Sequence, residues 1–316
     1  MTGRGQKTED GRGKTARGAR YLLFFLPFFV LSLPFSVLCK PKVVVSFSIL
    51  TDFVKTIGGD AIDVYAIVGP DSDPHVFQPT PQTAQDIATA DLVIMNGLGF
   101  EGWIERLLEA AHFRGPTVVV SKGVKVRYHA ATPDPHAWGD ARNALLYVRA
   151  IEGGLTKLLP LHAAQFRKNA ARFSKNLKQL DRWIRCEISK IPLQKRTAVT
   201  AHDAFGYFGA AYGMTFLAPQ GVSTDSEPSA KELSALVRNI QEGDLRVIFL
   251  EKSASEQLIR QLSEETGARV SGPLYSDALS TQDGPASTYI NLMRHNVRVL
   301  QEAMDNPVED APSEAH

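Results

Sequence analysis

The chain has 316 residues, of which 44% are hydrophobic and 22% are charged, and its formal net charge is +1. Residues 1–20 hold six of the 35 Lys and Arg but only two of the 34 Asp and Glu, so the chain from Lys40 onward has 29 basic and 32 acidic residues and a net charge of −3. No basic run remains after Lys40, and we therefore expect no nucleic-acid partner.

A basic segment at the N-terminus is followed by an uncharged apolar stretch at residues 21–39, YLLFFLPFFVLSLPFSVLC. This order is typical of a secretory signal peptide, so we predict one over residues 1–39 and a periplasmic or otherwise extracytoplasmic protein. A retained membrane anchor is the alternative, because a span needs about 20 apolar residues, although Pro27 and Pro34 disfavour a straight helix. Lipidation of Cys39 is less favoured, because the residue before it is not small.

The 277 residues after this leader are enough for two lobes, each with its own core. Cys186 is the only cysteine left in them. An internal disulfide and a cysteine-rich zinc site are therefore both excluded.

The first half alternates short apolar runs with helical patterns. Helices are expected over Pro81–Ala90, where proline suits the first turn, and over Gly102–Ala111. Four runs predict strands: Val43–Leu50, Val64–Val68, Leu92–Met95 and Thr117–Val120. This alternation predicts a parallel sheet with helices on both faces.

Between the halves, apolar residues recur every three or four positions and form one helical stripe. The stripe consists of Phe166, Ala170, Phe173, Leu177, Leu180, Ile184 and Ile188. A helix from about Ala163 to Ile191 would be roughly 43 Å long at ~1.5 Å per residue. It has no evident coiled-coil partner, so we expect a stiff strut packed along both lobes.

The second half repeats the plan of the first. A Ser-x-x-Glu capping box at Ser229 opens a helix that runs to about Ile240, and a further helix opens at residues 253–256. The expected strands are Thr197–Thr200, Thr215–Ala218, Val247–Leu250 and Arg269–Val270. We therefore predict an α/β fold of two lobes, each a parallel-rich sheet with flanking helices, joined by one long rigid helix. The expected boundaries are residues 40–160, 161–192 and 193–316.

Four residues stand on loops that follow strands, two from each half. The tripeptide Asp-Pro-His occurs twice and supplies His75 and His136, while His202 and Asp277 follow strands of the second half. Ligands of α/β folds bind at the carboxyl ends of strands, and three imidazoles with one carboxylate suit Zn²⁺. Each residue taken alone is more commonly a hydrogen-bonded loop or turn residue, so only the joint pattern predicts a metal site.

Several neighbours have less certain roles. Asp203 is either a support for an imidazole or an exposed helix cap. Glu251 ends a strand and could face the site, but we do not count it as a ligand. The remaining histidines are expected to be structural or exposed: His112, His129, His162, His295 and His316.

The same segments resemble the zinc/manganese (TroA/ZnuA-like) substrate-binding proteins of bacterial ABC importers. The similar segments are DPHVFQPTPQTAQDIATADLVIMNGLGFE, DPHAW, AHDAFGYFGAAYGM, GVSTDSEPSAKEL, LYSDALS and YINLMRHNV. The resemblance covers about Lys42 to Val297. It implies two α/β lobes joined by a long rigid helix, with a divalent metal buried in the cleft. The implied ligands are His75, His136, His202 and Asp277.

The implied role is that of a monomeric binding protein which delivers its metal to a membrane permease and is not an enzyme. We favour Zn²⁺ over Mn²⁺, because manganese members typically have a carboxylate where this chain has His202 and because three imidazoles are nitrogen-rich for Mn²⁺. The short segment 122–133 lacks the His-rich loop of many zinc members, which weakens a role in high-capacity zinc scavenging. The alternatives are a zinc-dependent hydrolase, which would keep an open position for water, and a metal-binding surface adhesin.

Overall fold

The computed structural model describes residues 40–252 and 255–305. The predicted signal peptide at residues 1–39 lies outside these ranges. Within them, no helix combines the length and the apolar character that crossing a membrane requires.

The first half forms a four-stranded sheet in the order β2-β1-β3-β4, and every neighbouring pair is parallel. Its strands are β1 (Lys42–Phe47), β2 (Asp63–Val68), β3 (Leu92–Met95) and β4 (Thr117–Val119). Its helices are α1 (Ser48–Gly58), α2 (Pro81–Ala88), α3 (Ile104–Ala110) and α4 (Ala141–Leu158). The predicted parallel sheet of this lobe is confirmed.

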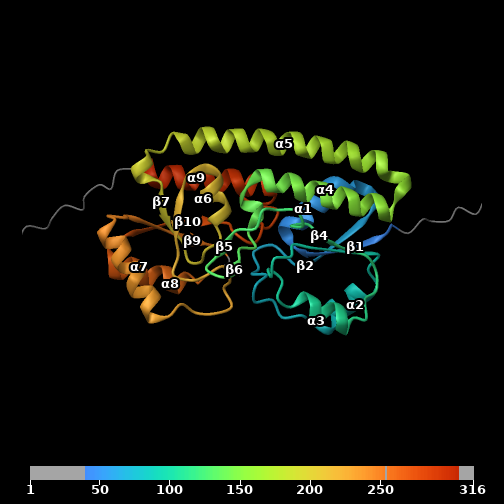
Figure 1. The fold of residues 1–316 in the computed structure, drawn as a ribbon, viewed down its shortest axis with the longest axis horizontal. Helices are drawn as coiled ribbons and strands as arrows, with labels where there is room; N and C mark the ends of the chain where they lie inside the picture. Colours follow the sequence, from blue (N-terminus) through green and yellow to red (C-terminus); the bar gives the residue numbers. More distant parts are fainter. Residues whose placement is uncertain (1–39, 253–254, 306–316) are drawn as a thin grey trace, which may run out of the picture. The chain divides into compact units, whose positions relative to one another are not determined.

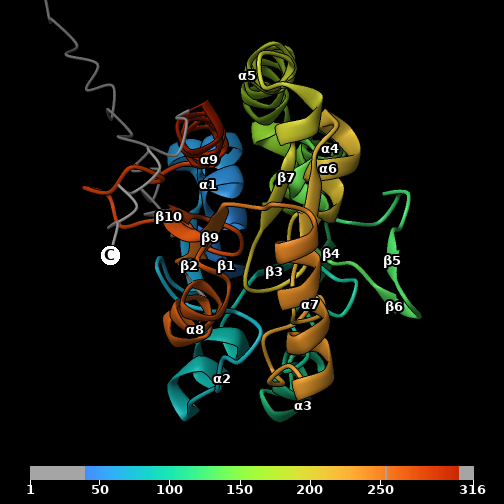
Figure 2. The ribbon, with the colours of Figure 1, turned by 90° about the vertical axis from the view of Figure 1, so that its left-hand side faces the viewer.

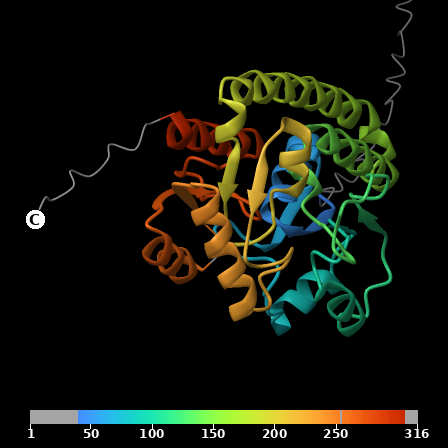
Figure 3. The ribbon, with the colours of Figure 1, turned by 60° about the vertical axis from the view of Figure 1, so that its left-hand side comes forward.

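The second half forms a second parallel sheet in the order β10-β9-β7-β8. Its strands are β7 (Thr197–Val199), β8 (Thr215–Leu217), β9 (Val247–Glu251) and β10 (Arg269–Leu274). Its helices are α6 (Gly206–Tyr212), α7 (Ala230–Glu242), α8 (Glu256–Thr266) and α9 (Tyr289–Asp305). Figure 3 shows β7 and β8 as yellow arrows that point the same way. The predicted parallel sheet of the second lobe is confirmed as well.

The long helix α5 spans Ala163–Ser189, and all seven residues of the predicted apolar stripe are buried. It packs against α1 and α4 from the first half and against α9 from the second. Figure 1 shows it running over α4 and α9. It ends shortly before Pro192, which cannot continue a helix. The predicted strut along both lobes is confirmed.

One predicted strand is too long. The run Val43–Leu50 leaves the sheet after Phe47, and its last three residues begin α1. The buried residues Ile49, Leu50, Phe53, Val54 and Ile57 recur with the helical period. The end of a buried strand and the start of a buried helix are both apolar. The apolar run alone therefore did not reveal where the strand ends and the helix begins.

The main hydrophobic core is continuous across the two halves. It includes Phe53 of α1, Leu177 of α5, Phe249 of β9 and Leu292 of α9. A smaller core around Ile248 and Ile259 belongs to the second half alone. The main core and α5 both extend over the two lobes, so neither marks where one lobe ends and the other begins. The lobe boundaries at residues 160 and 192 therefore remain a prediction.

A two-stranded hairpin lies outside both sheets. It is made by β5 (Tyr128–His129) and β6 (Thr132–Pro133), which pair antiparallel. Figure 2 shows the hairpin projecting from the body of the lobe. The segment after it leads to His136, so the hairpin lies directly before one of the predicted site residues.

Candidate metal centre

His75 lies on an irregular segment between β2 and α2. Its backbone N–H donates to the Asp73 carboxylate at 2.8 Å, and the Trp103 indole N–H holds the adjacent Pro74 carbonyl at 2.8 Å. The other Asp73 oxygen accepts from the Thr224 hydroxyl of the second lobe at 2.5 Å. These contacts fix the backbone of the segment and tie it to the opposite lobe.

His136 uses the second Asp-Pro-His in a related way. Asp134 Oδ1 accepts from the His136 backbone N–H at 2.9 Å, so the aspartate again fixes the histidine backbone. Here the same oxygen also lies 2.9 Å from His136 Nδ1. The Asn96 side chain, at the end of β3, donates to the Pro135 carbonyl at 3.0 Å. His136 is therefore held at both its backbone and its ring.

His202 lies three residues beyond the end of β7, and its side chain is fully buried. Its backbone N–H and that of Ala201 donate to Glu251 Oε1 at 3.0 and 2.7 Å. The other carboxylate oxygen of Glu251 lies 2.9 Å from His202 Nδ1. One carboxylate thus bonds the backbone and lies in ion-pair contact with the ring.

Asp277 lies on the loop after β10 and is also fully buried. Asn296 of α9 holds this loop, because its amide donates to the Tyr275 carbonyl at 2.7 Å and accepts from the Tyr275 N–H at 2.9 Å. The Trp138 indole donates to the Ser276 carbonyl at 3.0 Å. The loops of His136 and Asp277 are therefore joined across the lobes.

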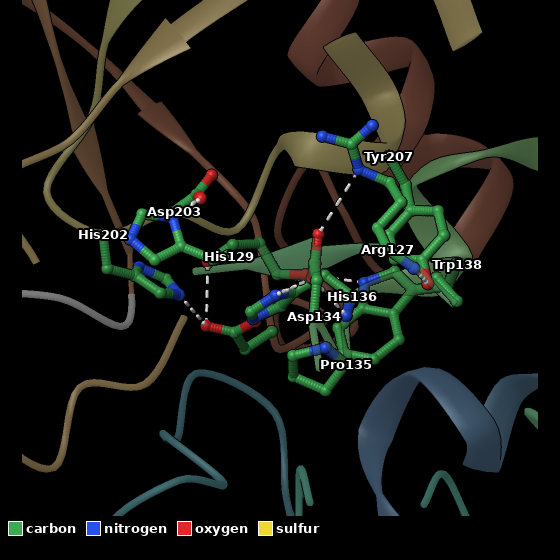
Figure 4. Close-up of polar contacts among 12 residues, drawn as sticks. Arg127, His129, Asp134, Pro135, His136, Trp138, His202, Asp203 and Tyr207 are labelled. Atoms are coloured by element: carbon green, nitrogen blue, oxygen red, sulfur yellow. Dashed lines mark hydrogen bonds and ion pairs between the residues drawn. The ribbon is translucent and has the colours of Figure 1, made fainter. Parts of the chain in front are cut away.

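The structure brings all four predicted residues together. One ligand atom from each of His75, His136, His202 and Asp277 lies within 4.8 Å of the other three. His75 Nε2 and His136 Nε2 are 3.4 Å apart, and the two Asp277 oxygens lie 3.2 Å from His136 Nε2 and from His202 Nε2. Tetrahedral ligands at about 2.05 Å from Zn²⁺ would be roughly 3.3 Å apart. The set can hold a metal ion, and its members come from both lobes. Figure 4 labels one of them from each lobe, His136 and His202.

The carboxylates act strongly on two of the imidazoles. Burial opposes the charge of His136, but Asp277 and Asp134 outweigh it and raise its pKa to about 9. Burial also opposes charge on His202, yet Glu251 and Asp277 raise its pKa well above the usual value. Burial likewise opposes the charge of Asp277, whose pKa is nevertheless lowered well below its usual value by His202 and His136. Without metal, these charges compensate one another.

His75 differs from the other two imidazoles. Burial dominates and lowers its pKa to about 3. Among the described residues, no hydrogen bond or ion pair joins its ring to a carboxylate, and it is only partly buried. It borders an open groove of about 660 Å³ whose lining includes Phe77, Trp103 and Arg106. Of the four residues, it is therefore the one least enclosed by protein.

Asp203 does not support an imidazole of this cluster by any hydrogen bond or ion pair among the described residues. Its carboxylate lies 2.7 Å from Nδ1 of the half-exposed His129, on the β5–β6 hairpin. Figure 4 shows this pair, and Arg127 with Asp134 near Tyr207. Exposed ion pairs of this kind contribute only about 0–1 kcal/mol to stability. Asp203 therefore links the hairpin to the second lobe outside the cluster.

Sequence reasoning did not identify the supports of the site. Asp134, Asn96 and Asn296 received no role, and Glu251 was left open. The repeated aspartate two residues before each histidine is the local signal for the backbone contact, because Asp side chains commonly bond the backbone two residues on. The contacts of Glu251 and Asn296 depend on neighbouring elements that only the fold brings together.

The chain has two α/β lobes, each with a four-stranded parallel sheet, and one long helix connects them. A cluster of three histidines and an aspartate is buried in the protein. This combination is that of the metal-binding substrate-binding proteins of ABC importers. The family model described as zinc-uptake complex component A, periplasmic, matches residues 43–303, and the chain belongs to this family.

Characterised relatives differ in the metal that their names state. The manganese-binding lipoprotein MntA of Bacillus subtilis is 34% identical over 273 residues, covering 83% of this chain and 89% of MntA. The iron-binding protein YfeA of Yersinia pestis is 32% identical over 266 residues, covering 83% and 85%. The solved periplasmic zinc-binding protein TroA of Treponema pallidum superposes with a TM-score of 0.81 at 31% identity, covering 84% of this chain and 99% of TroA.

Proposed function

We propose that the chain is exported, binds one divalent transition metal through His75, His136, His202 and Asp277, and delivers it to the membrane permease of an ABC importer. One observation carries this proposal: three imidazole nitrogens and a carboxylate from both lobes converge within 4.8 Å in the protein interior. Buried polar and charged groups need partners, and in the absence of metal His136, His202 and Asp277 have chiefly one another. A bound cation gives these groups a common partner.

Zinc is the proposed cargo. Nitrogen-rich sites favour zinc, whereas carboxylate, carbonyl and water ligands suit manganese. Relatives of this chain are named for manganese, iron or zinc, so membership of the family allows each of the three. The balance of three imidazoles to one carboxylate is what favours zinc here.

The role is that of a carrier and not of an enzyme. Four protein ligands complete a tetrahedral shell, whereas a catalytic zinc keeps one position for water. A complete shell gives tight capture, and release then requires at least one ligand to move away. The partly buried His75, on an irregular segment beside the groove, is the proposed ligand to leave. Because α5 packs on both lobes, local movement of this segment is favoured over wide separation of the lobes.

The metal content of the chain recovered from its native extracytoplasmic compartment tests this function. Elemental analysis is expected to give close to one zinc per chain. Recovery from the native compartment matters, because nitrogen and oxygen sites bind zinc more tightly than manganese in vitro whichever metal they carry in the cell. A preparation loaded mainly with manganese or iron would overturn the zinc assignment. A chain without any transition metal, and without affinity for added metal, would overturn the function itself.

A further inference from the structure

Glu251 is a buried carboxylate with no role in the proposed set of ligands. It is the last residue of β9, and its side chain is fully enclosed beside His202. One oxygen accepts two consecutive backbone N–H groups, from Ala201 at 2.7 Å and His202 at 3.0 Å. The second oxygen lies 2.9 Å from His202 Nδ1. Glu251 therefore contacts His202 on the side away from Asp277, which lies 3.2 Å from Nε2.

These contacts restrict the imidazole in two ways. The two backbone hydrogen bonds fix where the ring begins, and the carboxylate oxygen 2.9 Å from Nδ1 favours the ring state that places an N–H beside it. A neutral imidazole has one N–H and one lone pair. If Nδ1 donates its hydrogen to Glu251, the lone pair lies on Nε2 and points at the cluster. An outer carboxylate that orients a ligand histidine in this way commonly contributes 10- to 100-fold to metal affinity.

We infer that Glu251 is a positioning residue of the metal site, which holds His202 in the tautomer and orientation that present Nε2 to the metal. This inference rests on the proposed role of His202 as a ligand. It adds a residue that does not touch the metal and acts only through His202.

The chain offers a matched control in Glu101. This carboxylate is also buried and accepts two consecutive backbone N–H groups, from Asn96 at 2.6 Å and Gly97 at 3.1 Å. It also accepts from the Ser46 hydroxyl at 2.6 Å. Among the described residues, however, none of its hydrogen bonds reaches a ring of the cluster. Glu101→Gln therefore perturbs a buried carboxylate of the same kind that, among the described residues, is linked to the cluster only through Asn96 and not through the ring of a proposed ligand.

The test compares Glu251→Gln with Glu101→Gln in the full chain, using Zn²⁺ alone as the probe in a competition titration. The amide introduced by E251Q can still accept the two backbone N–H groups, but its NH₂ would face Nδ1 and favour the wrong tautomer. We expect E251Q to lower zinc affinity by 10- to 100-fold and E101Q to lower it by less than about threefold. With Co²⁺ as a spectroscopic probe, the visible absorption of E251Q should change, while that of E101Q should match the wild type.

A double-mutant cycle with His202→Ala separates positioning from general damage. In the H202A background, E251Q should change zinc affinity by less than about twofold, because the ring that it positions is gone. An equal loss in both backgrounds, or wild-type affinity and cobalt spectrum in E251Q, would overturn the inference. Wild-type affinity in H202A itself would instead overturn the proposed site.

Circular dichroism of the metal-free variants precedes these titrations. If E251Q does not fold, Glu251→Asp replaces it, because the shorter side chain keeps the charge but withdraws the carboxylate from Nδ1. E251D is expected to lose at least about fivefold in zinc affinity, and wild-type affinity there would overturn the inference.

Discussion

His202→Ala is expected to lower the affinity for Zn²⁺ by at least about 100-fold, the upper end of what the loss of a supporting residue alone removes. The substitution deletes one of four ligands, and it also leaves the buried carboxylates of Glu251 and Asp277 facing a space without the imidazole that now lies between them. A water molecule can occupy the vacated position but does not restore the nitrogen ligand. A competition titration with a chromophoric chelator measures the loss.

The control for this prediction is His129→Ala. His129 is half-exposed on the β5–β6 hairpin and pairs with Asp203 outside the cluster. Its removal should leave zinc affinity within about twofold of the wild type. If His202→Ala and His129→Ala both bind zinc like the wild type, the cluster is not where the metal binds.

The second prediction concerns how zinc affinity depends on pH. The pH range over which the affinity changes differs from the range that free histidine suggests. Three ordinary imidazoles would lose metal as the pH falls through about 6.5. In the metal-free protein, however, the pKa of His136 is raised to about 9 and that of His202 is raised well above its usual value. The pKa of His75, lowered to about 3, keeps this ring neutral at physiological pH. At pH 7 the entering metal must therefore displace protons from His136 and His202, but not from His75.

The sign of the effect follows from linkage. A pKa raised in the folded state, as for His136, stabilises the metal-free fold below about pH 6.5, and this contribution is lost as the pH rises through about 9. Metal binding has the opposite dependence, because protons compete with the metal. We therefore expect zinc affinity to increase steadily from pH 6 to pH 9, by about tenfold per pH unit for each proton displaced.

Calorimetric titration in buffers of different ionisation enthalpy measures this directly, because the released protons are taken up by the buffer. At pH 7 we expect close to two protons to be released for each zinc bound, one from His136 and one from His202. The metal-free chain should also lose thermal stability between pH 7 and pH 9, while the zinc-loaded chain does not. Zinc binding without proton release at pH 7, or an affinity that levels off above pH 6.5, would contradict the charged state assigned to His136 and His202.

The placement of His202 and Asp277, and less directly of His75, could be predicted because it depends on a general property of parallel sheets, whereas His136 follows the β5–β6 hairpin outside both sheets. The carboxyl ends of parallel strands lie at one edge of the sheet, so residues just after these strands gather there. The short apolar runs at Leu92–Met95 and Val247–Leu250 marked strands reliably, since the first is buried throughout, the second is buried at its centre, and both lie near turns. The stripe of α5 was equally clear, because seven residues share one period.

The differences between the two Asp-Pro-His copies could not be predicted. In both, the aspartate holds the histidine backbone. Only Asp134 also reaches the ring of its histidine, whereas the second oxygen of Asp73 bonds Thr224 of the other lobe. Identical tripeptides thus acquire different surroundings from residues distant in the sequence. The same holds for Glu251, whose importance depends on β7 lying beside β9.

The repeated motif therefore contributes two unequal members to the site. His136 is enclosed and held by a carboxylate, while His75 is partly open to the groove and has no such hold among the described residues. His202 is also enclosed beside a carboxylate, that of Glu251, which lies 2.9 Å from its Nδ1. A site with two fixed imidazoles, a fixed carboxylate and one less restrained imidazole suits a carrier that must both retain its cargo and release it.

X-ray absorption at the zinc edge of the zinc-loaded chain tests the central claim most directly, because it counts the ligands and identifies their type. The account predicts a four-coordinate zinc with three imidazole nitrogens at about 2.0–2.1 Å and one carboxylate oxygen at about 2.0–2.2 Å. A sulfur ligand, fewer than three imidazoles, or a bound water in place of a protein ligand would contradict a closed site formed by His75, His136, His202 and Asp277.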